Sequence, residues 1–116
     1  MKFLVVSYRG SDDVTMASIP WVAAKTASEQ GDEVTFWLFN EAVNLARVKG
    51  SALDIKAPGL PPLADVKSAV EDKVSLYVCK PCWVARNGDA TPAVGTLAGM
   101  PDFINHTKAA ERVVTF

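Results

Sequence analysis

Two cysteines, Cys79 and Cys82, form the one motif of this sequence whose residue types and spacing point to a specific chemistry. A cysteine thiolate is a strong nucleophile, and a second thiol three positions along the chain can close a disulfide with it. The Cys-x-x-Cys spacing therefore predicts sulfur chemistry, with Cys79 as the nucleophile and Cys82 as the thiol that resolves it.

The elements expected around the pair favour the thiolate form of Cys79. Residues 74–79 have the apolar, β-branched composition of a buried strand, and Pro81 is typical of the first turn of a helix. The sulfur of Cys79 would then lie uncovered at the edge of a sheet, beside unpaired backbone amides and the positive end of the helix dipole. We therefore expect an accessible and acidic thiol at this position.

Three neighbouring side chains are expected to support the pair. Lys80 adds a cation next to Cys79, and Arg86 lies one helical turn after Cys82, where it would hold an anionic sulfur donor. Tyr77 shares the strand face of Cys79, because side chains alternate along a strand, and is expected to line the site.

Other interpretations of the two thiols stay open. Cysteine is often buried as an inert hydrophobic residue, and the spacing also suits a dithiol redox protein or sensor that carries no sulfur. A third interpretation is a non-catalytic oligomeric binding module with incidental thiols. A structural zinc site usually has four protein ligands, whereas the sequence offers two Cys and one His, so we expect no metal and no other cofactor.

The remaining conspicuous side chains are expected to have structural roles. His106, the only histidine, lies on an expected helix and is predicted to be partly exposed and without a partner. Residues 9–11 are expected to form a plain turn, since they lack the glycine-rich pattern of phosphate-binding loops. Core or subunit-interface positions are expected for the three tryptophans, Trp21, Trp37 and Trp83.

Length and composition predict a single soluble globular domain over residues 1–116. The net charge of −1 gives no reason to expect nucleic acid as a partner, and it permits self-association. No apolar run reaches the roughly 18 residues that a membrane span needs, and no signal peptide is recognisable. We therefore expect a cytoplasmic protein that does not contact a membrane and whose thiols form no permanent disulfide.

Strand-like and helix-like patterns alternate along the sequence. Strands are expected at 2–8, 33–39, 74–79, 94–97 and 112–116, and helices at 14–30, 41–48, 62–70, 81–87 and 100–109. Asp12 or Asp13 would cap the first helix, and Pro20 would kink or restart it. Asn40 would cap the second helix. Residues 51–61 carry no periodicity and are expected to form a loop.

This alternation predicts an α/β fold. Right-handed crossovers between parallel strands place helices on both faces of a sheet. In such sheets, binding and reacting groups gather beyond the carboxyl ends of the strands. The loops that compete for this role are residues 9–13, 39–40 and 79–82.

Several features, taken in their order, resemble a known family. They are the opening strand with Arg9-Gly10, residues 32–39 followed by a short helix, the strand 75–78 that leads into Cys79-Lys80-Pro81-Cys82 with Arg86 and Gly88 behind it, Val94-Gly95-Thr96-Leu97, and the ending at 110–116. Over nearly its whole length the chain resembles the DsrE/DsrF-like family of sulfur-relay proteins, in particular its small stand-alone YchN-type branch.

The resemblance implies a three-layer α/β/α fold, flavodoxin-like in its layering, with a mainly parallel sheet of five strands. It also implies a homo-oligomer, either a trimer or a hexamer, that exchanges sulfur with donor and acceptor proteins. Cys79 matches the cysteine that carries sulfur as a persulfide in the family, and Cys82 matches a second cysteine found in some members. The expected function is thus that of an intracellular sulfur carrier or sulfurtransferase.

Overall fold

The computed structural model describes residues 1–50 and 53–116. Its elements, in chain order, are β1 (Lys2–Ser7), α1 (Val14–Glu29), β2 (Glu33–Leu38), the 3₁₀ helix η1 (Asn40–Ala46), α2 (Leu63–Val70), β3 (Ser75–Cys79), α3 (Lys80–Asn87), β4 (Thr96–Ala98), α4 (Met100–Ala109) and β5 (Arg112–Thr115). The predicted alternation is confirmed, and the helix predicted at 100–109 has the predicted bounds.

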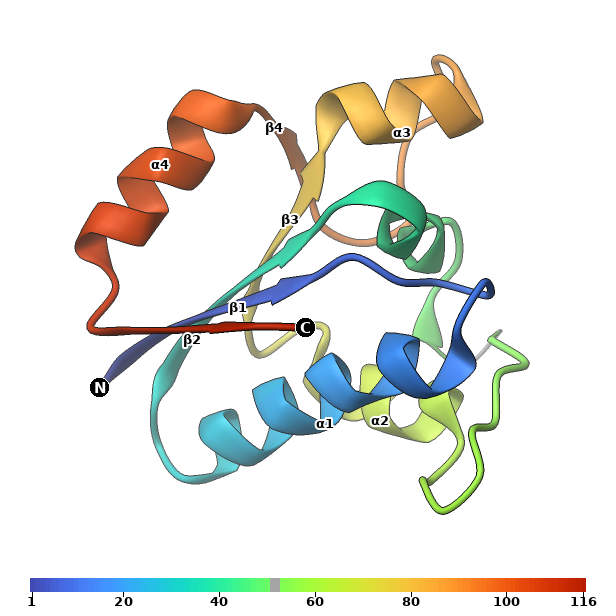
Figure 1. Cartoon of the computed structure of the whole chain (residues 1–116), viewed down its shortest axis with the longest axis horizontal. Coiled ribbons are helices and arrows are strands. Elements are labelled where there is room, and N and C mark those ends of the chain that lie inside the picture. Colours follow the sequence, from blue (N-terminus) through green and yellow to red (C-terminus); the bar gives the residue numbers. More distant parts are fainter. Residues whose placement is uncertain (51–52) are drawn as a thin grey trace.

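The strands form one parallel sheet in the order β4-β3-β2-β1-β5. Helices α1 and α2 cover one face of the sheet, and α4 covers the other (Figure 1). Helix α3 follows the carboxyl end of β3 and packs on η1. The structure therefore confirms the predicted three-layer α/β arrangement with a five-stranded sheet.

Local signals set the limits of α1. Its first turn is capped by Asp13, whose side chain accepts a hydrogen bond from the backbone N–H of Met16 at 3.1 Å. The helix continues through Pro20 and does not restart there. Beyond its end the chain turns at Gly31, where φ is +87°, a conformation that glycine adopts without steric cost.

The segment after β2 differs from the prediction. Asn40 does not cap a helix over 41–48; it is the first residue of η1, and its φ is +54°. This left-handed backbone costs a residue with a Cβ about 1 kcal/mol, so contacts with other parts of the chain must hold it in place. Of the loop predicted at 51–61, the part at 53–61 is a loop, and residues 51–52 lie outside the described residues.

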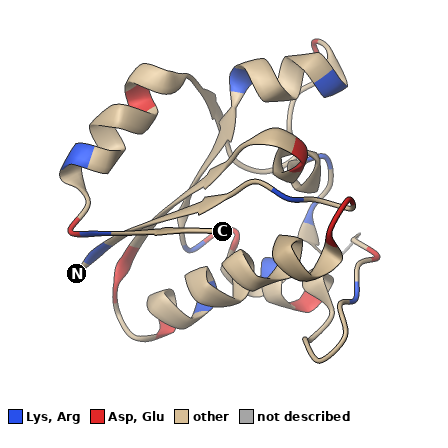
Figure 2. Cartoon of the chain, viewed as in Figure 1, with Lys and Arg blue, Asp and Glu red and all other residues tan. Residues whose placement is uncertain are grey.

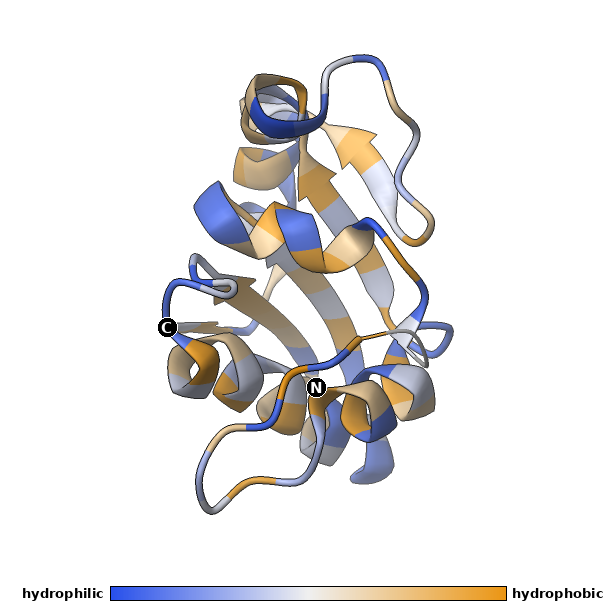
Figure 3. Cartoon of the chain, turned by 90° about the vertical axis from the view of Figure 1, so that its right-hand side faces the viewer, coloured by the Kyte–Doolittle hydropathy of each residue, from blue (hydrophilic) through white to orange (hydrophobic). Residues whose placement is uncertain are grey.

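Acidic and basic residues are interspersed over the molecule (Figure 2), and hydrophobic residues recur along the strands (Figure 3). All three tryptophans are buried, as predicted for core residues. One charged side chain breaks this pattern, because Lys67 of α2 is completely buried. Among the helices in the described part of the chain, none is both long enough and apolar enough to cross a membrane.

Candidate functional site

The three loops predicted to carry function meet at the carboxyl end of the sheet. The side chain of Asn40, which follows β2, donates a hydrogen bond at 3.1 Å to the carbonyl of Tyr8, which follows β1. Its amide oxygen accepts one at 2.9 Å from Arg86 of α3. Gly10 lies so close to η1 that an added Cβ would come within 2.5 Å of the Glu41 carbonyl oxygen. Only glycine therefore lets the first loop approach the second this closely.

The two cysteines lie where β3 passes into α3. Cys79 is the last residue of β3 and precedes the helix, and Cys82 is in the first turn of α3. Both thiols are free. Cys79 is buried, with 7% of its surface exposed, whereas Cys82 is half-buried. The sulfur that a partner molecule can reach more easily is therefore that of Cys82.

This burial shows that the prediction of an uncovered, acidic Cys79 was wrong. Burial raises the pKa of Cys79 above its ordinary value, because a low-dielectric environment disfavours the thiolate. The backbone amide of Cys82 acts in the opposite direction, but it forms no regular cap hydrogen bond and its effect is smaller. The neighbouring side chain of Cys82 raises the pKa further. At neutral pH, Cys79 thus keeps its proton.

Arg86 is bound within the protein, whereas the sequence predicted that it would hold a sulfur donor. Its Nε donates to a carboxylate oxygen of Glu41 at 2.8 Å. Its two terminal nitrogens donate to the amide oxygen of Asn40 at 2.9 Å and to the carbonyl oxygen of Cys82 at 3.1 Å. The positive charge still lowers the pKa of Cys79, although by less than burial raises it. Arg86 therefore connects α3 to η1 and acts on the thiols only indirectly.

Further hydrogen bonds fix α3 in place. The side-chain amide of Asn87 donates to Asn44 at 3.1 Å and accepts from Arg47 at 2.5 Å, and both partners belong to the η1 segment. The indole of Trp83 is buried and donates to the carbonyl of Ala90 at 2.7 Å. Cys82 therefore stands on a helix that has a fixed position relative to the sheet.

The other two side chains predicted to support the site lie outside this hydrogen-bond network. Lys80 is exposed in the first turn of α3. Tyr77 packs among aromatic rings, with its ring centre 5.3 Å from that of Trp37 and 4.5 Å from that of His106. The prediction that His106 has no partner was wrong, because its Nδ1 accepts a hydrogen bond from the indole of Trp37 at 2.9 Å.

Asn40 and Glu41 hold the site together but carry little signal in the sequence. A polar residue directly after a strand was the only indication for Asn40. Nothing local pairs Glu41 with Arg86, which is 45 positions away along the chain. Their roles follow from the packing of η1 against α3.

The raised pKa of Cys79 predicts how its alkylation depends on pH. In the Cys82→Ser variant, Cys79 is the only thiol, and burial still disfavours its thiolate. At neutral pH, iodoacetamide should react about ten-fold or more slowly with the folded variant than with the denatured variant, because only the thiolate reacts. This difference should shrink as the pH rises above 9.0, the ordinary pKa of the thiol.

The raised pKa of Cys79 also predicts how the stability of the protein depends on pH. Above pH 9.0 the folded protein still holds the proton of Cys79 while the unfolded chain has lost it, so the free energy of unfolding should fall as the pH rises in this range. The matched control is the Cys79→Ser variant, in which the half-buried Cys82 is the only thiol. An alkylation midpoint below pH 9.0 for Cys79 would contradict the structure.

The arrangement combines one protected thiol at the end of β3 with one more accessible thiol in the first turn of α3. The Cys82 side chain is close enough to raise the pKa of Cys79, so a group bound to one sulfur lies near the other. Within residues 1–50 and 53–116, no group of three or more His, Cys, Asp or Glu side chains is placed to hold a metal ion. The chemistry that these residues support is nucleophilic exchange between sulfur atoms.

The fold and the site define a small α/β protein with a pair of thiols at the carboxyl edge of a parallel sheet. The DsrE/DsrF-like family matches residues 1–116, and the chain belongs to this family. A search of the curated proteins gave no match. Among solved structures, the chain is similar to the ychN protein from E. coli, with a TM-score of 0.75 and 18% identity over 100% of this chain and 99% of that chain. This similarity shows a shared fold.

Proposed function

We propose that this protein receives sulfur and passes it on as a persulfide carried by Cys79 and Cys82. The observation that carries the proposal is the placement of a buried and a half-buried free thiol together at the carboxyl edge of the sheet, where β3 passes into α3. Membership of the DsrE/DsrF-like family, which is associated with sulfur relay, supports it.

The difference in exposure assigns the first step to Cys82. Its thiolate attacks the outer sulfur of a donor persulfide, the sulfur–sulfur bond of the donor breaks, and the donor leaves as a thiolate with the bonding electron pair. Cys82 then carries the transferred sulfur as a persulfide. This order reverses the one expected from the sequence, in which Cys79 attacks the donor.

In the second step the sulfur moves to Cys79. The Cys79 sulfur attacks the outer sulfur of the Cys82 persulfide, the bond to Cys82 breaks, and the proton of Cys79 passes to the departing Cys82 sulfur. One persulfide replaces another, so no oxidant or reductant is consumed. Because the reaction is intramolecular, it tolerates a nucleophile with a raised pKa. Burial then protects the sulfur until it returns through Cys82 to an acceptor thiol.

A dithiol redox cycle is the second candidate, and the closeness of two free thiols at the β3–α3 junction favours it as well. Here Cys79 attacks the inner sulfur of the Cys82 persulfide, a disulfide forms between the cysteines, and the outer sulfur leaves as hydrosulfide. The persulfide sulfur is reduced and the two cysteines are oxidised, which balances the electrons of this step. An external thiol reductant must then convert the disulfide back to the dithiol to close the cycle.

Mass spectrometry of the intact protein after incubation with glutathione persulfide separates the two candidates. Sulfur transfer predicts a mass increase of one sulfur atom that dithiothreitol reverses. A redox cycle predicts the loss of two hydrogens together with release of sulfide. An unchanged mass would contradict both and would favour a binding module with incidental thiols.

We also propose that the protein is a cytoplasmic homo-oligomer, a trimer or a hexamer, that exchanges sulfur with donor and acceptor proteins. Exposed apolar side chains on and near α4 support self-association, and they are Met100, Ile104 and Val113. Light scattering of the purified protein should give three or six times the mass of the 12.4 kDa chain. A mass equal to that of one chain would contradict the oligomer.

A further inference from the structure

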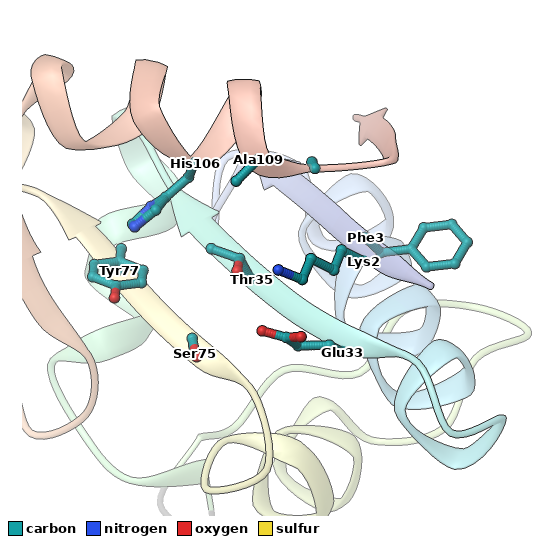
Figure 4. Close-up of a pocket in the computed structure, with 9 residues that line it drawn as sticks. Lys2, Phe3, Glu33, Thr35, Ser75, Tyr77, His106 and Ala109 are labelled. Atoms are coloured by element: carbon teal, nitrogen blue, oxygen red, sulfur yellow. The ribbon is translucent and has the colours of Figure 1, made fainter.

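A cleft of about 220 Å³ lies between α4 and the sheet, at the opposite end of the strands from the cysteines (Figure 4). Its polar lining comes from three neighbouring strands and from α4. Lys2, Glu33 and Ser75 are the first residues of β1, β2 and β3, respectively. The other polar lining residues are Thr35, Tyr77 and His106.

Two opposite charges face this cleft without forming an ion pair. Lys2 and Glu33 are partners in the register of β1 and β2, so their side chains lie on the same face of the sheet. Figure 4 shows the Lys2 ammonium and the Glu33 carboxylate both pointing into the cleft. Among the residues that the structure describes, neither side chain has a salt-bridge partner. A ligand with a carboxylate and an ammonium group would satisfy both charges.

His106 presents a hydrogen-bond donor of fixed orientation to the same space. Its Nδ1 accepts the indole N–H of Trp37 at 2.9 Å, so the proton of the neutral ring is on Nε2. The fully buried Trp37 and the Tyr77 ring, which is tilted against the imidazole, hold the His106 ring, which points from α4 toward Tyr77 in Figure 4. Hydroxyl groups of Thr35 and Ser75 add further polar contacts on the floor of the cleft.

We propose that this cleft binds a small zwitterion of the size and charge of a free amino acid. The ligand carboxylate contacts Lys2, the ligand ammonium contacts Glu33, and a short side chain extends toward Tyr77 and His106. The volume of about 220 Å³ is below the range of roughly 300–1,000 Å³ that is usual for drug-sized ligands, which limits the occupant to a small molecule. Because Lys2 and Glu33 are exposed, we expect an affinity of about 1 mM.

The indole N–H of Trp37 supplies an NMR signal that tests this site directly, because its acceptor His106 lines the cleft. It is identified as the indole signal that moves in the His106→Asn variant.

The titration compares three small molecules that are added to the full chain: L-alanine, propionate and ethylamine. Propionate lacks the ammonium group of alanine, and ethylamine lacks its carboxylate. We expect L-alanine to shift the signal to saturation, and the other two to bind about ten-fold or more weakly, a difference of about 1.4 kcal/mol.

Matched variants locate the binding. Glu33→Gln and Lys2→Met should each weaken L-alanine binding several-fold, whereas Lys25→Met, at a partly exposed position on α1, should leave it unchanged. The absence of a saturable shift with L-alanine would overturn the proposal, and so would equal binding of propionate or no effect of Glu33→Gln. Sulfur loading should be unchanged in all three variants, so this site and the thiol site can fail independently.

Discussion

The Cys82→Ser variant is expected to take up sulfur from glutathione persulfide about ten-fold or more slowly than the unchanged protein, because the remaining thiol of Cys79 is buried and protonated. The Cys79→Ser variant should take up sulfur at nearly the unchanged rate, since the half-buried Cys82 is still present. It should then lose this sulfur to dithiothreitol about ten-fold faster, because no buried position protects it. Mass spectra recorded over time measure both rates.

Two controls make this comparison specific. The variant with both cysteines replaced by serine should gain no mass, and thermal unfolding shows whether each single variant is folded. The opposite pattern, with rapid loading in Cys82→Ser and none in Cys79→Ser, would mean that sulfur reaches Cys79 directly, as the sequence alone suggested. Equal loading of both single variants would contradict an ordered transfer between the two thiols.

The Glu71→Gln variant is expected to show the largest loss of stability. Lys67 and Glu71 form an ion pair in which the side chains are 0% and 7% exposed. The Lys67 ammonium also donates to the Val48 carbonyl at 3.0 Å, and the Glu71 carboxylate accepts from the Gly50 amide at 3.1 Å. Removing the anion leaves a buried ammonium without its counter-charge, which should reduce the free energy of unfolding in urea by roughly 3–5 kcal/mol.

An exposed pair with the same spacing provides the matched control. Lys25 and Glu29 on α1 are also four residues apart, but their side chains are 37% and 61% exposed. Glu29→Gln should therefore reduce the free energy of unfolding by less than about 1 kcal/mol. If Glu71→Gln and Glu29→Gln reduced the free energy of unfolding by similar amounts, the burial of the Lys67–Glu71 pair would have no energetic consequence.

The loss in Glu71→Gln should also depend on pH. Burial lowers the pKa of Lys67 below its ordinary value of 10.5, and the Glu71 carboxylate opposes this shift. Without the carboxylate, the folded protein releases the Lys67 proton at a lower pH than the unfolded chain does. The unfolded chain then holds more protons, so the stability of the variant should rise as the pH increases toward 10.5.

Much of the fold was predictable because its signals are local. Alternating apolar residues mark each strand, and Asp13 and Gly31 cap and end α1 through their own side-chain and backbone chemistry. The Cys-x-x-Cys motif could be placed at a strand–helix junction for the same reason, since a buried strand precedes it and a proline opens the next helix.

Features that depend on distant partners were not predictable in this way. Trp37 and His106 are 69 positions apart, and only the packing of α4 on the sheet brings their nitrogens within 2.9 Å. Lys67 resembles any charged residue of an amphipathic helix in the sequence, yet its burial depends on contacts with the segment around Val48 and with Trp21 of α1. Sequence periodicity describes one element at a time and carries no record of such pairs.

The sequence by itself determined the elements, the parallel α/β class and the position of the two thiols at the carboxyl edge of the sheet. Only the tertiary structure decided the strand order and which of the two sulfurs is accessible. The backbone amide of Cys82 at the start of α3 is a local feature, and it favours the thiolate of Cys79. Desolvation depends on everything that packs around the sulfur, and it outweighs this amide, so Cys79 became the protected thiol and the half-buried Cys82 the more accessible one.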